Sequence, residues 1–148
     1  MRVDFYQLSR DPAELVVPLI ARATRNAGER LLVVSDDDAQ LGLIGDALWE
    51  RAPEAFLANG RADAAHADRQ PILLSESGEN LNAAQALFMI DGAEIGVTDG
   101  LERCFIIFDG RNDHALTGSR ERWKALKAQG ATLAYWKQSP EGRWEKAG

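Results

Sequence analysis

Short apolar runs recur along the chain, separated by longer stretches in which apolar residues return at helical spacing. Runs of four to six aliphatic and aromatic residues are typical of strands in a buried, mostly parallel sheet. We therefore expect strands at residues 3–8, 31–34, 71–75, 86–90, 104–108 and 132–137, and a short hairpin partner for the last of them at 142–146.

Three stretches between these runs carry the spacing of amphipathic helices. The first contains Pro18, which cannot donate a hydrogen bond to the preceding turn, so this helix should be kinked or begin late. Residues 58–70 are polar and are expected to form an exposed loop. The helices are predicted from residue 12 to a stop at 28, from an acidic cap at 36–38 to about 49–51, and from about 117 to 129.

Strands that alternate with helices predict an α/β protein. A length of 148 residues suits one domain, which we place at residues 1–148. Right-handed crossovers would place helices on both faces of the sheet. The expected fold is a single-domain three-layer α/β/α sandwich with a mostly parallel sheet and a Rossmann-like topology.

The motifs that usually carry chemistry on such folds are missing from the sequence. It has no phosphate-binding loop and no glycine fingerprint after the first strand, so we expect no nucleotide cofactor. Asp36–Asp38 could hold Mg²⁺, although helix capping explains these acids more simply. His66 and His114 have no partner at metal-ligand spacing, and Cys104 lies in an apolar run typical of a buried structural thiol. We therefore expect neither catalytic nor metal-binding residues, and a metal- or nucleotide-dependent hydrolase remains the alternative.

The net charge of −6 conceals an asymmetry between the two parts of the chain. Residues 111–148 contain eight basic and four acidic residues, a net charge of +4, which leaves −10 for residues 1–110. The acidic body argues against sequence-blind coating of nucleic acid. A basic segment on an acidic body favours a localised site for an anionic partner.

The third predicted helix carries most of this positive charge on one stripe. Arg120, Trp123, Lys124 and Lys127 follow one another at positions i, i+3, i+4 and i+7. A cationic surface beside a large aromatic ring suits a peptide that presents acids next to an apolar residue or a free carboxylate. Two other interpretations stay open: a solvated basic face with Trp123 in the core, and a groove for single-stranded DNA.

The segment ALWERAPEAF at residues 47–56 is the second candidate interaction site. Trp49 and Phe56 lie at the end of a predicted helix and in the segment beyond Pro53. Such aromatic residues are either part of the core or anchors of a protein–protein interface. The sequence alone does not separate these two alternatives.

Taken together, FYQL near the start, DALWERAPEAF in the middle, and RERWKALKAQG with TLAYWK near the end resemble the chi subunit of bacterial DNA polymerase III. The resemblance implies a non-catalytic accessory subunit of the clamp-loader complex, active in DNA replication. Members of this family bind the acidic C-terminal tail of single-stranded-DNA-binding protein, and they also bind the psi subunit. Contact with DNA would then be mainly indirect.

Carried over residue by residue, the resemblance assigns tail binding to Arg120, Trp123 and Lys124 in the segment RERWK. It assigns psi binding to Trp49 and Phe56. Weaker candidates for the tail site are Arg122, Tyr135 and Trp136. Since the sequence shows no apolar signal-peptide core and no apolar run of about 20 residues, we expect a cytoplasmic protein.

Overall fold

One eight-stranded sheet runs through the structure, a computed structural model that describes residues 1–50, 57–93 and 100–148. The strands lie in the order β3-β4-β2-β5-β6-β1-β7-β8, and all neighbouring pairs are parallel except β7 with β8. Their bounds are β1 Arg2–Leu8, β2 Leu31–Val34, β3 Asn59–Arg61, β4 Ile72–Ser75, β5 Ala86–Ile90, β6 Arg103–Asp109, β7 Thr132–Gln138 and β8 Trp144–Lys146.

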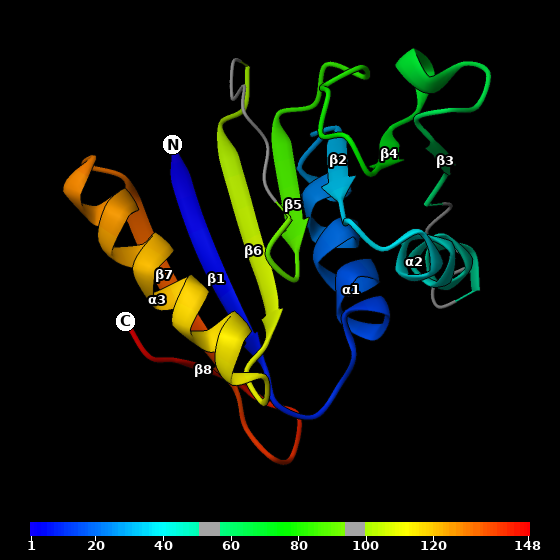
Figure 1. Ribbon diagram of the computed structural model, residues 1–148. Coiled ribbons are helices and arrows are strands. Elements are labelled where there is room, and N and C mark those ends of the chain that lie inside the picture. Colours follow the sequence, from blue (N-terminus) through cyan, green and yellow to red (C-terminus); the bar gives the residue numbers. More distant parts are fainter. Residues whose placement is uncertain (51–56, 94–99) are drawn as a thin grey trace.

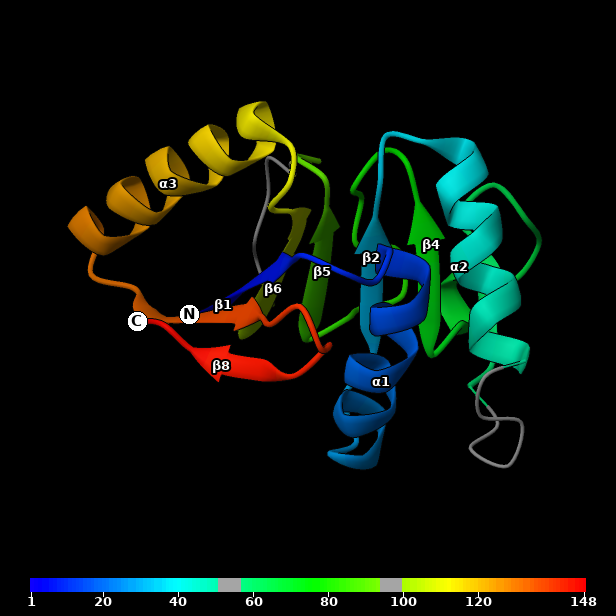
Figure 2. The ribbon, with the colours of Figure 1, turned by 90° about the horizontal axis from the view of Figure 1, so that it is seen from below.

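Helices cover both faces of this sheet (Figure 1). α1 (Ala13–Asn26) and α2 (Asp38–Glu50) contact each other on one face, and α3 (Asp113–Ala128) lies on the opposite face along β1, β6 and β7 (Figure 2). The predicted α/β sandwich with a mostly parallel sheet is thereby confirmed. Within the described part of the chain, no helix is long and apolar enough to span a membrane.

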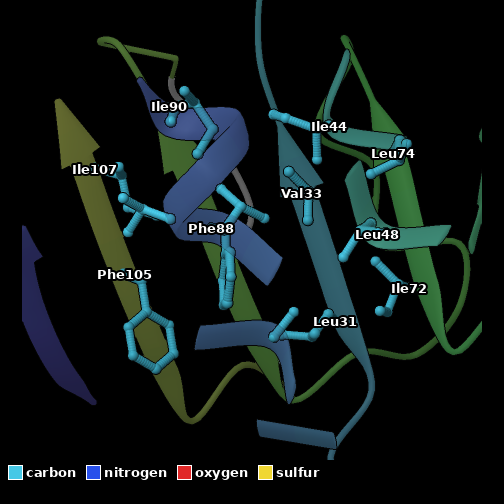
Figure 3. Packing of buried hydrophobic residues seen from close by; sticks show 14 of the residues in the cluster. Leu31, Val33, Ile44, Leu48, Ile72, Leu74, Phe88, Ile90, Phe105 and Ile107 are labelled. Carbon is cyan, nitrogen blue, oxygen red and sulfur yellow. The ribbon is translucent and has the colours of Figure 1, made fainter. Parts of the chain in front are cut away.

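Two apolar clusters, one on each face, hold the layers together. Alternate residues of a strand point to opposite faces, so each central strand contributes to both clusters. Leu31 and Val33 of β2 pack under α1 and α2 together with Phe88 of β5, as Figure 3 shows. Leu32 and Val34, their neighbours in β2, pack on the other side in the cluster that includes Trp123 and Leu126 of α3.

The predicted strands agree with the observed ones to within one or two residues, and the expected hairpin partner is β8. The prediction of an exposed loop at 58–70 is wrong, because this segment contains β3 and a 3-10 helix at Ala67–Arg69. β3 pairs in parallel with β4, and only that long-range pairing makes a strand of the sequence NGR.

α3 begins earlier than the predicted start at about 117, whereas α1 begins within one residue of the predicted start at 12. α3 starts at Asp113 because the side chain of Asn112 accepts a hydrogen bond from the backbone N–H of Ala115, which caps the first turn. α1 starts at Ala13, directly after Pro12, and continues through Pro18 to Asn26. The buried positions along α1 stabilise it against the missing hydrogen-bond donor of Pro18.

Candidate functional site

The three residues predicted for tail binding line one pocket on the α3 face. The pocket has a volume of 470 Å³ and lies between α3, the carboxyl-terminal halves of β1 and β7, and the segment after β8. The geometry therefore brings together side chains from distant parts of the chain. The lining residues are Gln7, Arg120, Trp123, Lys124, Tyr135, Lys137, Ala147 and Gly148.

An aromatic cluster forms the wall of this pocket. Phe5 of β1 is fully buried, and its ring centroid lies 5.3 Å from that of Trp123 in an edge-on arrangement. Tyr135 lies nearly parallel to Phe5 at 5.9 Å and meets Trp123 edge-on at 5.7 Å. Trp123 is therefore half-buried on Phe5, with its remaining surface at the pocket. The Trp123 ring therefore both packs against the core and lines the pocket.

Hydrogen bonds hold Tyr135 in place. Its hydroxyl donates to Oε1 of Gln7 at 2.5 Å. Its backbone N–H donates to the carbonyl oxygen of Gly148 at 3.1 Å, and its carbonyl oxygen accepts from the N–H of Ala147 at 2.8 Å. Burial raises the pKa of the Tyr135 hydroxyl, and the nearby charge of Arg120 partly opposes this rise. The phenol is therefore neutral at physiological pH and acts as a fixed hydrogen-bond donor.

The rim of the pocket is cationic. Arg120, Lys124 and Lys137 line it, and none of the lining residues is an Asp or a Glu. Lys127, the fourth member of the predicted stripe, does not line the pocket. Three cations around an aromatic wall favour a ligand that carries several carboxylates and one apolar group.

Four lining residues were not among the sequence candidates: Gln7, Lys137, Ala147 and Gly148. The signal for Lys137 is the alternation within β7, which places Leu133, Tyr135 and Lys137 on the α3 face. The same alternation within β1 places Val3, Phe5 and Gln7 on that face, but only the pairing of β1 with β7 brings Gln7 next to Tyr135.

Two of the weaker candidates lie elsewhere. Trp136 follows Tyr135 in β7 and therefore lines a groove on the opposite face of the sheet. Arg122 faces other hollows along α3 and does not line the pocket of Arg120. Adjacent positions in the sequence are thus separated by the geometry of a strand or a helix.

The second candidate site is only partly described. Trp49 lies in the last turn of α2 with 53% of its surface exposed, so the alternative that it is a core residue is wrong. Leu43 of the same helix is also 53% exposed. Phe56, the other residue predicted for psi binding, lies outside the described residues.

The acidic turn before α2 has structural partners. A carboxylate oxygen of Asp37 accepts hydrogen bonds from the backbone N–H groups of Ala39 and Gln40, at 3.0 and 3.3 Å. Asp38 pairs with Arg61, which lowers the pKa of its carboxyl group. Across residues 1–50, 57–93 and 100–148, no group of three or more His, Cys, Asp or Glu side chains is placed to hold a metal ion.

Cys104 is buried, as its apolar run predicts. Burial raises the pKa of its thiol to about 12. The neutral thiol form therefore dominates at physiological pH, which fits a structural role in the β6 core.

The open sheet and the pocket define an α/β protein with a cationic, aromatic-walled pocket on one face. The chain matches the family described as DNA polymerase III chi subunit, HolC, over residues 1–134 of its 148. It belongs to this family, which is that of an accessory subunit of DNA polymerase III and serves DNA replication. The resemblance seen in the sequence motifs is thereby confirmed. No curated protein matches the chain.

Proposed function

We propose that this protein is a non-catalytic subunit of the clamp-loader complex in the cytoplasm, and that its pocket binds the acidic C-terminal tail of single-stranded-DNA-binding protein. Arg120, Trp123 and Lys124 are the residues that bind this tail. The observation that supports the proposal is the combination of a cationic rim with an aromatic wall in one pocket. Trp49 and Phe56 are proposed to bind the psi subunit.

The chemistry of the tail matches the pocket. In this family the tail is a run of aspartates that ends in proline and phenylalanine with a free carboxylate. The terminal ring packs against Trp123, and the carboxylates accept hydrogen bonds from Arg120 and Lys124. Charge-assisted hydrogen bonds of this kind are about twice as strong as neutral ones. Lys137, on the opposite wall, adds a third cation to the rim.

The charge distribution supports a division of labour between the two proteins. Residues 1–110 carry a net charge of −10, which disfavours contact with the DNA backbone. The partner protein would hold the DNA, and this subunit would hold the partner. Its contact with DNA is therefore indirect.

The test is a titration of a labelled tail peptide against the wild-type protein and two matched variants. Arg120→Ala removes a cation from the rim, and we expect the affinity to fall about tenfold or more, the cost of removing one charge-assisted hydrogen bond. Lys127→Ala removes the same charge from the same helix but outside the pocket. This control should weaken binding by no more than about twofold, the scale of an exposed charge effect.

Equal effects in the two variants would mean that the peptide responds only to the overall charge of α3, which would contradict the assignment. Unchanged affinity in Arg120→Ala would contradict it as well. A single-stranded oligonucleotide should bind weakly in the same assay. If it bound more tightly than the tail peptide, direct DNA binding would replace the proposal.

Psi binding is tested at the exposed end of α2. Because Trp49 is 53% exposed, Trp49→Ala should leave the stability of the protein nearly unchanged. Co-purification with a psi subunit should be abolished, since exposed tryptophans are typical anchors of an interface. The matched control is Leu81→Ala, which truncates an apolar side chain that is 44% exposed elsewhere on the surface. Retention of psi by the Trp49 variant would contradict this assignment.

A further inference from the structure

A second aromatic surface lies on the opposite face of the sheet from the tail pocket. Tyr6 of β1 and Trp136 of β7 are register partners, and their rings are nearly parallel with centroids 6.4 Å apart. Trp144 of β8 meets Tyr6 edge-on at 5.2 Å, and Phe105 of β6 lies 6.0 Å away on the other side. Tyr6, Trp136 and Trp144 are only partly buried, so these rings form an open aromatic platform.

Helix α1 borders this platform and completes a groove. The groove has a volume of 360 Å³ and lies between the aromatic rings and one face of the helix. That helix face presents Leu19 and Ala23, followed at the C-cap by Ala27, at intervals of four residues, and Leu19 is 67% exposed. Both walls are thus apolar and reach the solvent, an arrangement typical of a surface that a partner covers.

The groove occupies a position that a helix would normally fill in a three-layer fold. On this face α1 contacts β2 and β6, and the described residues place no helix over β7 and β8 (Figure 2). On the opposite face α3 covers β7. Sheets of this class usually bury both faces under helices, so half of one layer is open at the platform.

The charged side chains at the groove indicate the sign of the charge that an occupant should carry. Arg103 lines the groove, with its guanidinium 4.5 Å from the centre of the Phe105 ring. It donates to a carboxylate oxygen of Asp4 at 3.0 Å, and Arg2 lies 3.5 Å from the same oxygen. Two cations, Arg103 in the groove and Arg2 beside it, therefore share the one buried carboxylate of Asp4, so the net charge of these three groups is positive.

From these observations we propose that the groove binds an amphipathic helix of a partner protein, with apolar residues against the platform and an acidic residue at Arg103. The stripe from Val16 to Ala27 is about 16 Å long, since a helix rises 1.5 Å per residue, so about eleven residues of a partner helix fit beside it. The small side chains of Ala23 and Ala27 allow close approach of two helix axes. The site is separate from both the tail pocket and Trp49.

The probe is a synthetic amphipathic helical peptide of about twelve residues, with leucines along one face and a single Glu in its last turn. It is added to the full chain carrying Trp49→Phe and Trp123→Phe. Of the four tryptophans, only Trp136 and Trp144 then remain, and both line the groove. Binding is followed by their fluorescence, so the result does not depend on the tail site.

The Glu peptide should change this fluorescence in a saturable way and should bind about three- to tenfold more tightly than the same peptide with Gln. Ala23→Arg places an unpaired charge in the groove and should weaken binding about tenfold or more. Asn26→Arg adds the same charge to the same helix at an exposed position that does not line the groove, and it should bind the peptide as tightly as the parent chain with Trp49→Phe and Trp123→Phe.

Three results would overturn the proposal. The first is equal binding of the peptide to the Ala23→Arg and Asn26→Arg variants. The second is equal affinity for the Glu and Gln peptides. The third is a dimer of the protein alone, detected by its mass in solution, that Ala23→Arg dissociates, because a second copy of the chain would then be the occupant.

Discussion

Phe5 connects the stability of the fold to the shape of the pocket proposed to bind the tail, so Phe5→Leu tests both. The ring is fully buried and packs on Trp123 and Tyr135, which form the pocket wall. The change to leucine costs about 1 kcal/mol through the smaller volume and different shape of the side chain. Removing each of the two ring–ring interactions costs about 1 kcal/mol more. The variant should therefore be about 3 kcal/mol less stable than the wild type.

For a chain of 148 residues, this destabilisation corresponds to a fall in Tm of about 10 °C. The free energy of unfolding is measured by urea titration. The second readout is the near-ultraviolet circular dichroism of the aromatic cluster, which should change because Trp123 is no longer supported by Phe5. Binding of the tail peptide should weaken several-fold, since the pocket wall is no longer held in its bound geometry.

Phe88→Leu is the matched control. Phe88 is also fully buried, but it lies in the cluster under α1 and α2, where its ring centroid is 4.8 Å from that of Phe105. Because this substitution removes a single ring–ring interaction, the expected cost is about 2 kcal/mol. The tail affinity should not change. Two results would refute the inference that Phe5 supports the pocket wall. One is an equal loss of affinity for the tail peptide in both variants, and the other is a loss of stability below about 1 kcal/mol in Phe5→Leu.

Two further predictions concern groups whose pKa is raised by burial. Both tyrosines of the chain, Tyr6 and Tyr135, have a pKa above the ordinary value of 10.0, because burial disfavours the charged phenolate. The stabilisation from the neutral phenols is fully present below pH 10 and is lost as the pH rises above it. In an ultraviolet titration of the tyrosine hydroxyls, the midpoint for the native protein should therefore lie at higher pH than the midpoint in urea. Coinciding midpoints would contradict this prediction. Cys104, whose pKa is raised to about 12, should react with a thiol reagent at neutral pH only after unfolding, whereas rapid labelling of the native protein would disprove its burial.

The central strands could be predicted from the sequence because their signal is local. Runs such as LLVV at 31–34 and CFIIF at 104–108 are too apolar for the surface, and they are buried in β2 and β6. β3 could not be predicted in this way. Its residues, Asn59–Arg61, have low strand propensity, and their conformation depends on pairing with β4.

The candidate pocket was predictable in part for the same reason. Arg120, Trp123 and Lys124 lie within one helix, where spacing alone places them on one face. The hydrogen bond between Tyr135 and Gln7 spans 128 positions of the chain, and no local pattern encodes such an interaction. The pocket wall therefore becomes visible only when β1 and β7 are placed side by side.

The sequence by itself determined the α/β class, the basic stripe on α3 and the membership of the chi family, because each follows from the order and spacing of neighbouring residues. The tertiary structure alone decided that Trp136 and Trp144 lie together on the face opposite Trp123. Trp123 lines the pocket beside α3, Trp136 and Trp144 line the groove on the other face, and Trp49 is exposed on α2. The physical reason is that the direction of a side chain depends on the face of its own strand or helix, whereas its neighbours depend on segments far away in the chain.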